Sequence, residues 1–436
     1  MGSKLPAGYL KWILAIALTA IVSSVSTWAV VTYVGPSPGP APAPTEYTKA
    51  AWIYVGPIGD YGWTHAHNLG RLYVDSYFPW LTTHYVESVS EGDCPSVIDS
   101  LVAKGYTIIF TTSFGFMDAT LEAAKEYPDI MFFHCSGYKR WDNMGTYFAE
   151  FYQLYYLNGL MAGALTKTGK AGYVAAYPIP EVIRHINAFA IGFAEVAEQR
   201  YARGELPNPP EVHVVWIYEW YNPAKAREAA ESLITKGCDV LAFTEDSPTV
   251  VTVCEEHYKR GEPIYTFAHY SPMYAYGPDV VVSGQLVHWE VIYADIIAKI
   301  ASGVYTTENL KAVDYWWMLH EGAVELGCNY SMPINPKFEA PLKSVTVVDK
   351  LTNETMTVYD LVFLRLEQMK DETPHVQVIS GGEITWLTPN VTFDPFMGPL
   401  YDQDGNLRVP AGERLGHDEL WTMMWFVKWV IGTIPT

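Results

Sequence analysis

The chain has 436 residues, enough for two globular lobes and additional segments, so a single small module is excluded. Its hydrophobic content of 49% supplies ample core and argues against a disordered chain. The formal net charge of −20 argues against nucleic acid or an anionic membrane surface as a partner of the folded part, because like charges repel at long range.

The N-terminal segment predicts a location outside the cell. Residues 12–34 follow a short cytoplasmic stub at 1–11, carry no charge and are long enough to cross a bilayer. The run is longer than a typical secretory signal core, which favours an uncleaved membrane anchor over a cleaved signal peptide. Residues 35–47 are rich in proline and predict a semi-extended linker. We therefore expect residues 48–436 to form an extracellular domain tethered to the cell membrane.

The first strand–loop–helix corner of this domain has the features of a ligand site. An apolar run at 50–54 ends in a turn rich in glycine and proline, and a helical segment beginning near Trp63 follows. Glycines allow close backbone approach and Trp63 offers a flat apolar face, so we expect Trp63 and the turn residue Asp60 to contact a ligand. A structural turn with a core tryptophan is the alternative. His67 lies one helical turn after Trp63 and either faces the site or packs beneath the loop.

Strands and helices alternate along the rest of the chain, which predicts parallel sheets covered by helices. The first unit has predicted strands at 83–89, 107–111 and 130–135 and helices at 94–104 and 118–127. A helix at 150–168 leads to a second unit, with strands at 171–176, 211–218, 239–244 and 263–268 and helices at 181–199, 224–236 and 248–259. The segments 280–286, 288–302 and 315–325 are expected to pass between the units.

Aromatic and acidic residues stand at the predicted strand ends, where ligands of open α/β sheets bind. They are Phe114, Asp118 and Tyr138 in the first unit and Asp246 and His269 in the second. Such a set suits a flat, uncharged or cationic ligand that stacks on rings and donates N–H groups to carboxylates. Phosphate is disfavoured because the loops carry almost no Lys or Arg. The two aspartates also stand near helix starts, so helix capping is their structural alternative.

Five cysteines without a C-x-x-C pair argue against a metal cluster. An extracellular location permits a disulfide, for which Cys238 and Cys254 are the first candidates, and the odd number leaves at least one free thiol. Asn329, Asn353 and Asn390 each begin a glycosylation tripeptide, although chance explains these tripeptides nearly as well.

Several motifs occur in a characteristic order along the chain. They are GDYGWTHAH at 59–67, FTTSFGFMD at 110–118, GYVAAYPIPEVIR at 172–184, DSP at 246–248, GPLYDQDG at 398–405 and the tail at 418–430. Together they resemble the basic membrane protein family of ABC-transporter substrate-binding proteins, over about 50–337 and 376–432. The resemblance implies the α/β type I periplasmic-binding-protein fold, in which two Rossmann-like lobes are joined by a three-strand hinge and close on a ligand.

This resemblance implies lobe boundaries and site roles. Lobe 1 would comprise about 48–168, 283–310 and the C-terminal tail, lobe 2 about 169–282 and 315–340, and 341–374 would be an insertion. Characterised receptors of the family bind purine nucleosides or bases. The stacking role falls on Trp63, with Phe114 or Tyr138 as the opposite face, and base recognition falls on Asp118 or Asp246. Trp289 is a further aromatic candidate, in a segment that lacks the lysine with which the nucleoside-binding branch holds ribose; a free base such as adenine is therefore favoured.

The leading hypothesis is a receptor that needs no cofactor and passes a purine base or nucleoside to an ABC permease in the membrane. A cell-surface structural or sensory protein that reuses the fold is the first alternative. A nucleoside-processing enzyme using Asp60 and His67 is less favoured, because the chain has no Ser-His-Asp order, no H-E-x-x-H spacing and no cofactor fingerprint.

Overall fold

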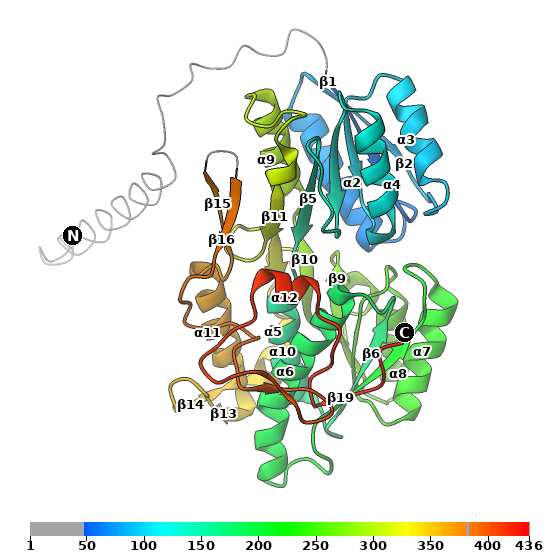
Figure 1. The fold of residues 1–436 in the computed structure, drawn as a ribbon. Coiled ribbons are helices and arrows are strands. Elements are labelled where there is room, and N and C mark those ends of the chain that lie inside the picture. The colour runs from blue at the N-terminus through cyan, green and yellow to red at the C-terminus, as the bar shows by residue number, and fades with distance from the viewer. Residues whose placement is uncertain (1–47, 381–382, 436) are drawn as a thin grey trace, which may run out of the picture. The chain divides into compact units, whose positions relative to one another are not determined.

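The computed structural model describes residues 48–380 and 383–435. The predicted stub at 1–11, anchor at 12–34 and linker at 35–47 all lie outside these ranges. Within the described ranges, no helix is both long enough and apolar enough to span a membrane. The described chain forms two α/β lobes connected by three chain crossings (Figure 1).

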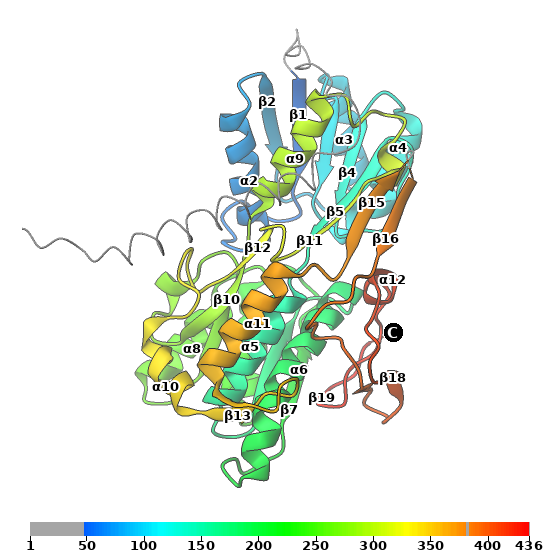
Figure 2. The same ribbon diagram turned by 90° about the vertical axis from the view of Figure 1, so that its left-hand side faces the viewer.

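Lobe 1 is built on a parallel six-stranded sheet of order β11-β5-β4-β3-β1-β2. Its strands are β1 (Thr48–Ile53), β2 (Leu81–Val86), β3 (Ile108–Thr111), β4 (Met131–Cys135), β5 (Met144–Ala149) and β11 (Asp314–Trp317). The helices around it are α2 (Trp63–Tyr77), α3 (Cys94–Ala103), α4 (Met117–Glu126) and α9 (Trp289–Ala301). Strands β1, β3, β4 and β5 consist mainly of buried residues, as expected for a sheet that is covered on both faces. Figures 1 and 2 show the helices on either side of this sheet.

Lobe 2 contains a seven-stranded sheet of order β12-β10-β9-β8-β6-β7-β19, in which only β12 runs antiparallel to its neighbour. The strands are β6 (Lys170–Ala175), β7 (Glu211–Trp216), β8 (Val240–Phe243), β9 (Tyr265–Tyr270), β10 (Val281–Val287), β12 (Val324–Leu326) and β19 (Val430–Ile431). Its main helices are α5 (Tyr152–Leu165), α6 (Pro180–Ala202), α7 (Pro223–Thr235) and α8 (Thr249–Lys259). Helices α5 and α6 touch backbone to backbone at Gly159 and Gly192, where an added Cβ would lie about 2 Å from a carbonyl oxygen of the other helix.

Three segments cross between the lobes and form the hinge. They are the connections from β5 to α5 at 150–151, from β10 to α9 at 288 and from β11 to β12 at 318–323. The backbone N–H of Glu150 donates to the carbonyl of Trp317 at 2.8 Å, which joins the first crossing to the start of the third. In the second crossing, Nδ1 of His288 lies 2.8 Å from Oε1 of Glu290, and its Nε2 lies 2.9 Å from Oε2 of Glu325. The expected three-strand hinge is thus present.

The lobe boundaries differ from those expected from the sequence. Helix α5, expected in lobe 1, packs on α6 in lobe 2, and β10 pairs with β9 in lobe 2. Strand β11, expected in lobe 2, pairs with β5 in lobe 1. The C-terminal tail ends with β19 paired to β7 in lobe 2. Each difference arises because strand pairing and helix packing join distant segments, whereas the sequence displays only their order.

The segment 341–374, expected to be an insertion, folds onto lobe 2. It contains the end of α10 (Pro336–Ser344), the hairpin β13 (Thr346–Val348) and β14 (Thr355–Thr357), and α11 (Val358–Asp371), which packs on α5. Then follow the hairpin β15 (Val376–Ser380) and β16 (Glu383–Leu387), the small pair β17 (Leu400–Tyr401) and β18 (Leu407–Val409), and α12 (His417–Trp421). Figure 1 shows α12, in red, beside the hinge.

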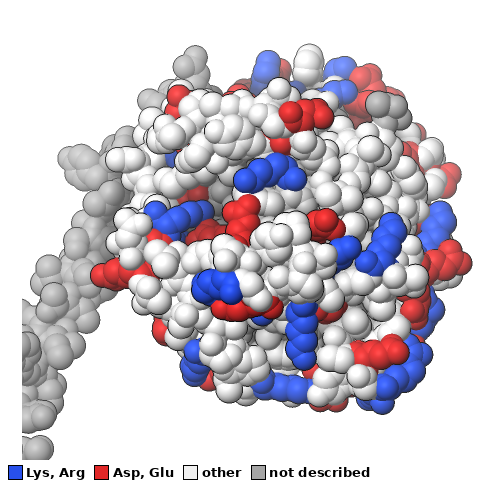
Figure 3. All heavy atoms as spheres, turned by 90° about the horizontal axis from the view of Figure 1, so that it is seen from below, with Lys and Arg blue, Asp and Glu red and all other residues white. Residues whose placement is uncertain are grey.

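All five cysteines are free and buried, so the predicted disulfide between Cys238 and Cys254 is wrong. Both thiols pack in one apolar cluster of lobe 2, where burial raises the pKa of Cys238 to about 12 and also raises that of Cys254. They behave as small core side chains. Of the predicted glycosylation sites, Asn353 and Asn390 are exposed and Asn329 is half-buried. On the face of the molecule seen in Figure 3, basic and acidic side chains are interspersed.

Candidate functional site

The loop between β1 and α2 is held by Asp60. This carboxylate is 1% exposed and accepts hydrogen bonds from the backbone N–H groups of Gly62, Thr64 and His65, each at 2.9 Å. It therefore satisfies donors at the start of α2, as a helix cap does. Burial raises the pKa of Asp60, while these N–H groups act to lower it. Asp60 shapes the site and does not line the pocket described below.

Trp63 stands at the first position of α2, on a layer of buried aromatic rings. Its indole N–H donates to the carbonyl of Thr112 at 2.6 Å, which fixes the ring against the end of β3. Beneath it, the rings of His67 and Trp289 stack on each other with their centroids 4.1 Å apart, and both side chains are fully buried. The alternative in which His67 packs beneath the loop is the one observed, and burial lowers the pKa of His67 well below its usual value. Neither His67 nor Trp289 lines the pocket.

A pocket lies at the carboxyl ends of the strands, between the two lobes. Its lining residues are Val55, Trp63, Ser113, Phe114 and Ser136 from lobe 1, and Glu181, Trp220, Asp246 and Tyr270 from lobe 2. The predicted residues Trp63, Phe114 and Asp246 are thus brought together from the segments that follow β1, β3 and β8. Among the described residues that line this pocket, none is Lys or Arg. Its walls therefore offer flat rings, hydroxyls and carboxylates.

The lobes are closed on each other at this pocket. The Ser271 hydroxyl of lobe 2 donates to the Gly62 carbonyl of lobe 1 at 3.3 Å, and Ser136 of lobe 1 donates to Glu181 of lobe 2. A Cβ at Gly62 would lie 2.9 Å from the Cα of Asp246, so the two backbones are in contact. The free space inside the pocket is about 10 Å³, roughly the room that one water needs. A ligand larger than water enters only when the lobes separate or the walls rearrange.

The charged groups of the pocket are all acidic. Asp246 is 2% exposed and its Oδ1 has no hydrogen-bond partner among the described residues. Burial raises the pKa of Asp246 well above its usual value, and the nearby carboxyls of Asp60, Glu245 and Glu181 raise it further. Burial likewise raises the pKa values of Glu181 and Glu245, which are 3% and 0% exposed. The site is therefore short of hydrogen-bond donors and positive charge, which a ligand can supply.

Several loops at the pocket hold a non-glycine residue in the left-handed backbone region. The φ angles are 59° at Tyr61, 70° at Ser136, 54° at Tyr218 and 60° at Tyr270. Bulky side chains rarely adopt this conformation, and such strained positions cluster at functional sites. These residues follow or end β1, β4, β7 and β9, so the strain occurs at the strand ends of both lobes.

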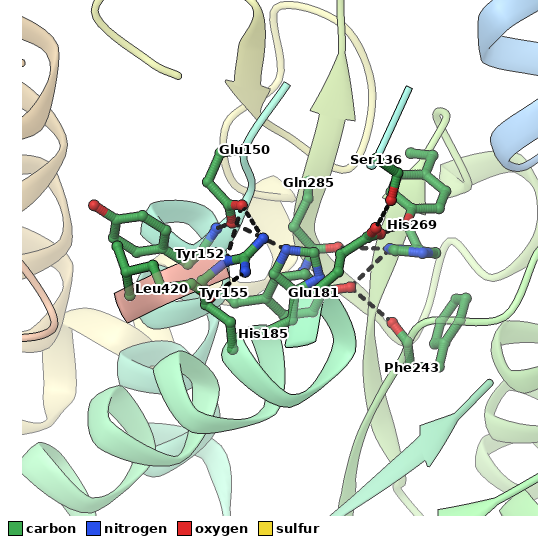
Figure 4. Close-up of polar contacts among 12 residues, drawn as sticks. Ser136, Glu150, Tyr152, Tyr155, Glu181, His185, Phe243, His269, Gln285 and Leu420 are labelled. Carbon is green, nitrogen blue, oxygen red and sulfur yellow. Dashed lines mark hydrogen bonds and ion pairs between the residues drawn. The ribbon is translucent and has the colours of Figure 1, made fainter. Parts of the chain in front are cut away.

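Three other predicted site residues lie away from the pocket. Asp118 is exposed on α4 and forms an ion pair with Lys139, and Tyr138 is 52% exposed. His269 is fully buried behind the pocket, where its Nδ1 lies 2.8 Å from the Tyr155 hydroxyl (Figure 4). Burial lowers the pKa of His269 well below its usual value, so it serves as a neutral hydrogen-bonding group.

The pocket also contains residues that were not singled out from the sequence. Glu181 lies in the first turn of α6, and Tyr270 ends β9 and donates to it at 3.3 Å. Trp220 lies in the loop after β7 and accepts, through its carbonyl, the backbone N–H of Asp246 at 2.6 Å. Trp220 could have been predicted, because ligands bind beyond the carboxyl ends of strands and Trp220 follows β7. The sequence around Glu181 does not indicate that this side chain is buried.

A wider cavity of about 790 Å³ lies between α6 and the C-terminal segment, away from the cleft. Some of its polar groups have partners: Glu195 pairs with Lys350 at 2.8 Å, and Glu198 accepts the indole N–H of Trp429 at 2.6 Å. Among the described residues, Glu195 Oε1 and Arg414 Nη1 have no hydrogen-bond partner. This cavity lies away from the carboxyl ends of the two sheets, where ligands of open α/β folds bind.

Two α/β lobes, three crossings and a pocket at the facing strand ends define a bilobed solute-binding protein of the type I periplasmic-binding-protein fold. Solved structures agree with this fold. A solute-binding protein from Aeropyrum pernix K1 has a TM-score of 0.57 at 18% identity and covers 74% of this chain and 86% of its own. One from Conexibacter woesei has a TM-score of 0.52 at 17% identity, covering 74% and 96%.

Residues 47–361 match the family model described as Bmp, ABC transporter substrate-binding protein PnrA-like. The chain therefore belongs to this family of ABC-transporter substrate-binding proteins. A purine-binding protein from Brucella abortus is 32% identical over 393 residues, which are 89% of this chain and 95% of that protein. A putative ABC transporter glucose-binding protein from Haloferax volcanii is 34% identical over 306 residues, which are 69% and 73% of the two chains.

Proposed function

We propose that this protein binds a purine base, adenine or a close analogue, between its lobes and delivers it to an ABC permease. In this proposal residues 12–34 anchor the protein in the membrane, with the lobes outside the cell. The observation that carries the proposal is the pocket itself, where buried carboxylates without a cationic partner face aromatic rings. An amino-substituted purine supplies what this pocket lacks, because its ring edge carries several N–H donors and its faces stack on rings.

The arrangement of the groups suits a ligand that joins the lobes. Trp63 and Phe114 belong to lobe 1, and Asp246 and Glu181 belong to lobe 2. A base stacked on the lobe 1 rings would donate N–H groups to the lobe 2 carboxylates, and the Oδ1 of Asp246 would gain a partner. A ligand that touches both lobes stabilises the closed arrangement over the open one, so closure follows binding as a shift of population.

The chemistry of the pocket also ranks related ligands. Nucleotides are disfavoured, since a phosphate would approach acidic groups with no Lys or Arg in the lining. Oxo-purines present a carbonyl where adenine presents an amino group, and a carboxylate does not donate to it. The segment 281–289 has no lysine for ribose, so a nucleoside is expected to bind more weakly than the free base.

Two relatives support different solutes. The Brucella abortus relative is named for purine binding and aligns with most of this chain, which supports a purine. The Haloferax volcanii relative is named for glucose binding, and carboxylates and aromatic faces also suit sugar hydroxyls and sugar rings, so glucose is the second candidate.

The test is isothermal titration of the full chain in detergent with adenine, hypoxanthine, adenosine, AMP and glucose. We expect the tightest binding with adenine, weaker binding with adenosine and no binding with AMP. Asp246→Asn should weaken adenine binding, whereas the exposed Asp118→Asn serves as a matched control and should not. Binding of glucose alone would keep the transport class and replace the solute. No binding of any of the five would overturn the proposed ligand and favour a surface or sensory role.

A further inference from the structure

A cluster of buried charges lies at the hinge, next to the cleft but outside it. Glu150, in the first crossing, accepts hydrogen bonds from Arg184 at 3.0 Å and 2.5 Å and lies 3.1 Å from Nε2 of His185 (Figure 4). All three side chains are fully buried. Burial by itself would raise the pKa of Glu150, but Arg184 and His185 outweigh it and lower that pKa to about 2. The pair of Glu150 and Arg184 is therefore ionised at neutral pH.

Arg184 also contacts parts of both lobes. Its guanidinium lies over the ring of Trp316 at 4.8 Å and over that of Trp421 at 5.6 Å, and its Nη1 donates to the Leu420 carbonyl at 2.7 Å. Trp316 belongs to β11 of lobe 1, whereas Leu420 and Trp421 belong to α12 in the C-terminal segment. The ring of Phe148, at the end of β5, lies 5.8 Å from that of Trp421. The planar guanidinium is thus packed where lobe 1 meets lobe 2.

Helix α6 connects this cluster to the cleft. Glu181, which lines the pocket, lies three residues before Arg184 and four before His185, so the three residues occupy one side of the helix. Glu181 accepts the hydroxyl of Ser136 across the cleft, and Arg184 holds the hinge crossing through Glu150. The first two turns of one helix therefore contact both the ligand pocket and the hinge.

We infer that Arg184 is a positioning residue that sets the balance between open and closed lobes without touching the ligand. Arg184 stacks on Trp316 of lobe 1 in the closed arrangement. Because a rotation of lobe 1 would move Trp316 relative to α6, we expect this contact to be made only when the lobes are closed. Arg184 also ties the hinge crossing to α12 through a forked, planar group that lysine does not reproduce. The inference rests on the proposed function in one respect: it assumes that a ligand binds between the lobes when they close.

The experiment compares Arg184→Lys with a matched control in the full chain. Spin labels at Glu122→Cys on α4 and Lys259→Cys on α8 report the distance between the lobes, since both parent side chains are exposed and the native cysteines are buried. The control is Arg365→Lys, at another fully buried pair, that of Arg365 with Asp349; neither residue belongs to the three hinge crossings. Distances are measured without and with adenine.

We expect Arg184→Lys to increase the open population without ligand several-fold and to weaken adenine binding about tenfold, and Arg365→Lys to leave both unchanged. Parent-like distances in Arg184→Lys, or an equal shift in Arg365→Lys, would overturn the inference. If Arg184→Lys does not fold, Trp421→Phe keeps the ion pair but reduces the ring surface under it; a shift in the same direction supports the inference and parent-like distances refute it. Absence of adenine binding in the parent would refute the proposed ligand, while the ligand-free distances would still decide the role of Arg184.

Discussion

Replacing Asp246 by asparagine should change stability and affinity in opposite directions. In the folded protein this carboxyl is buried beside three other carboxyls, and its Oδ1 has no partner among the described residues. Because its pKa is raised on folding, the stability of the parent is greatest below the unfolded pKa and is lost as the pH rises toward the folded value. An amide removes this penalty, so the variant should be more stable at neutral pH.

The expected size follows from the groups involved. Removing the buried charge relieves its desolvation penalty, which contributes about 1–3 kcal/mol to the free energy of unfolding. The same substitution removes a charge-assisted hydrogen bond to the ligand, which is worth about 1.5–3 kcal/mol, or roughly 10- to 150-fold in Kd. A more stable receptor that binds adenine more weakly is therefore the signature of a carboxylate placed for a ligand.

Thermal melting between pH 5 and pH 8 and titration with adenine measure the two effects. The parent should lose stability across this interval relative to the variant, because only the parent carries the buried carboxyl. Asp118→Asn, at an exposed position, should alter neither quantity. A variant that melts lower than the parent, or that binds adenine equally well, would show that Asp246 is a structural group and would refute the reasoning.

Three further changes test other parts of the site. Gly62→Ala should weaken ligand binding with little change in the open form, because a Cβ would lie 2.9 Å from the Cα of Asp246 only when the lobes are closed; unchanged affinity in titration would contradict the observed closure. Trp63→Ala should weaken adenine binding by about 1–3 kcal/mol and lower the free energy of unfolding by about 3–5 kcal/mol, measured by titration and urea unfolding, since its ring is 6% exposed. His288, whose two glutamate partners raise its pKa to about 9, should stabilise the parent fully below pH 6.5 and lose this effect as the pH rises through 9. His288→Gln should abolish this pH-dependent loss of stability, which is roughly 1–2 kcal/mol after solvent screening. Equal pH profiles of urea unfolding in the parent and the variant would argue against a stabilising contact of His288 with the two glutamates.

The sequence was sufficient for most of the secondary structure but not for the division into lobes. Long apolar runs such as 239–244 and periodic segments such as 181–199 correspond to β8 and α6, because burial requires such patterns. Strand β5 was not predicted, since Gly145, Thr146 and Ala149 dilute its apolar character. The predicted lobe boundaries were wrong where a strand pairs with a segment distant in the sequence. Strand β11, for example, pairs with β5, and the sequence around β11 does not indicate this partner.

The meeting of Trp63, Phe114 and Asp246 at one pocket could be expected from the sequence, because ligands of open α/β sheets bind beyond the strand ends. The sequence did not predict which side chains point into the pocket and which point to solvent. Asp60 and Asp118 have similar local surroundings, yet the first caps a buried turn and the second is exposed to solvent. Glu181 was overlooked because a glutamate in the first turn of a helix is usually solvated, and only the packing of lobe 1 against α6 buries it.

The distribution of charge in the cleft would favour separation of the lobes when no ligand is bound. Asp60 belongs to lobe 1 and Asp246 to lobe 2, and their proximity in the closed arrangement raises the pKa of Asp246, which means that closure brings like charges together. Without a ligand, closure must either protonate a carboxyl or accept this repulsion in a site of low dielectric. A ligand with N–H donors removes the penalty, because each donor gives a buried carboxylate a partner. The same carboxylates would then provide affinity when the ligand is present and favour separation of the lobes when it is absent, which is the behaviour a transport receptor requires to distinguish its loaded state from its empty one.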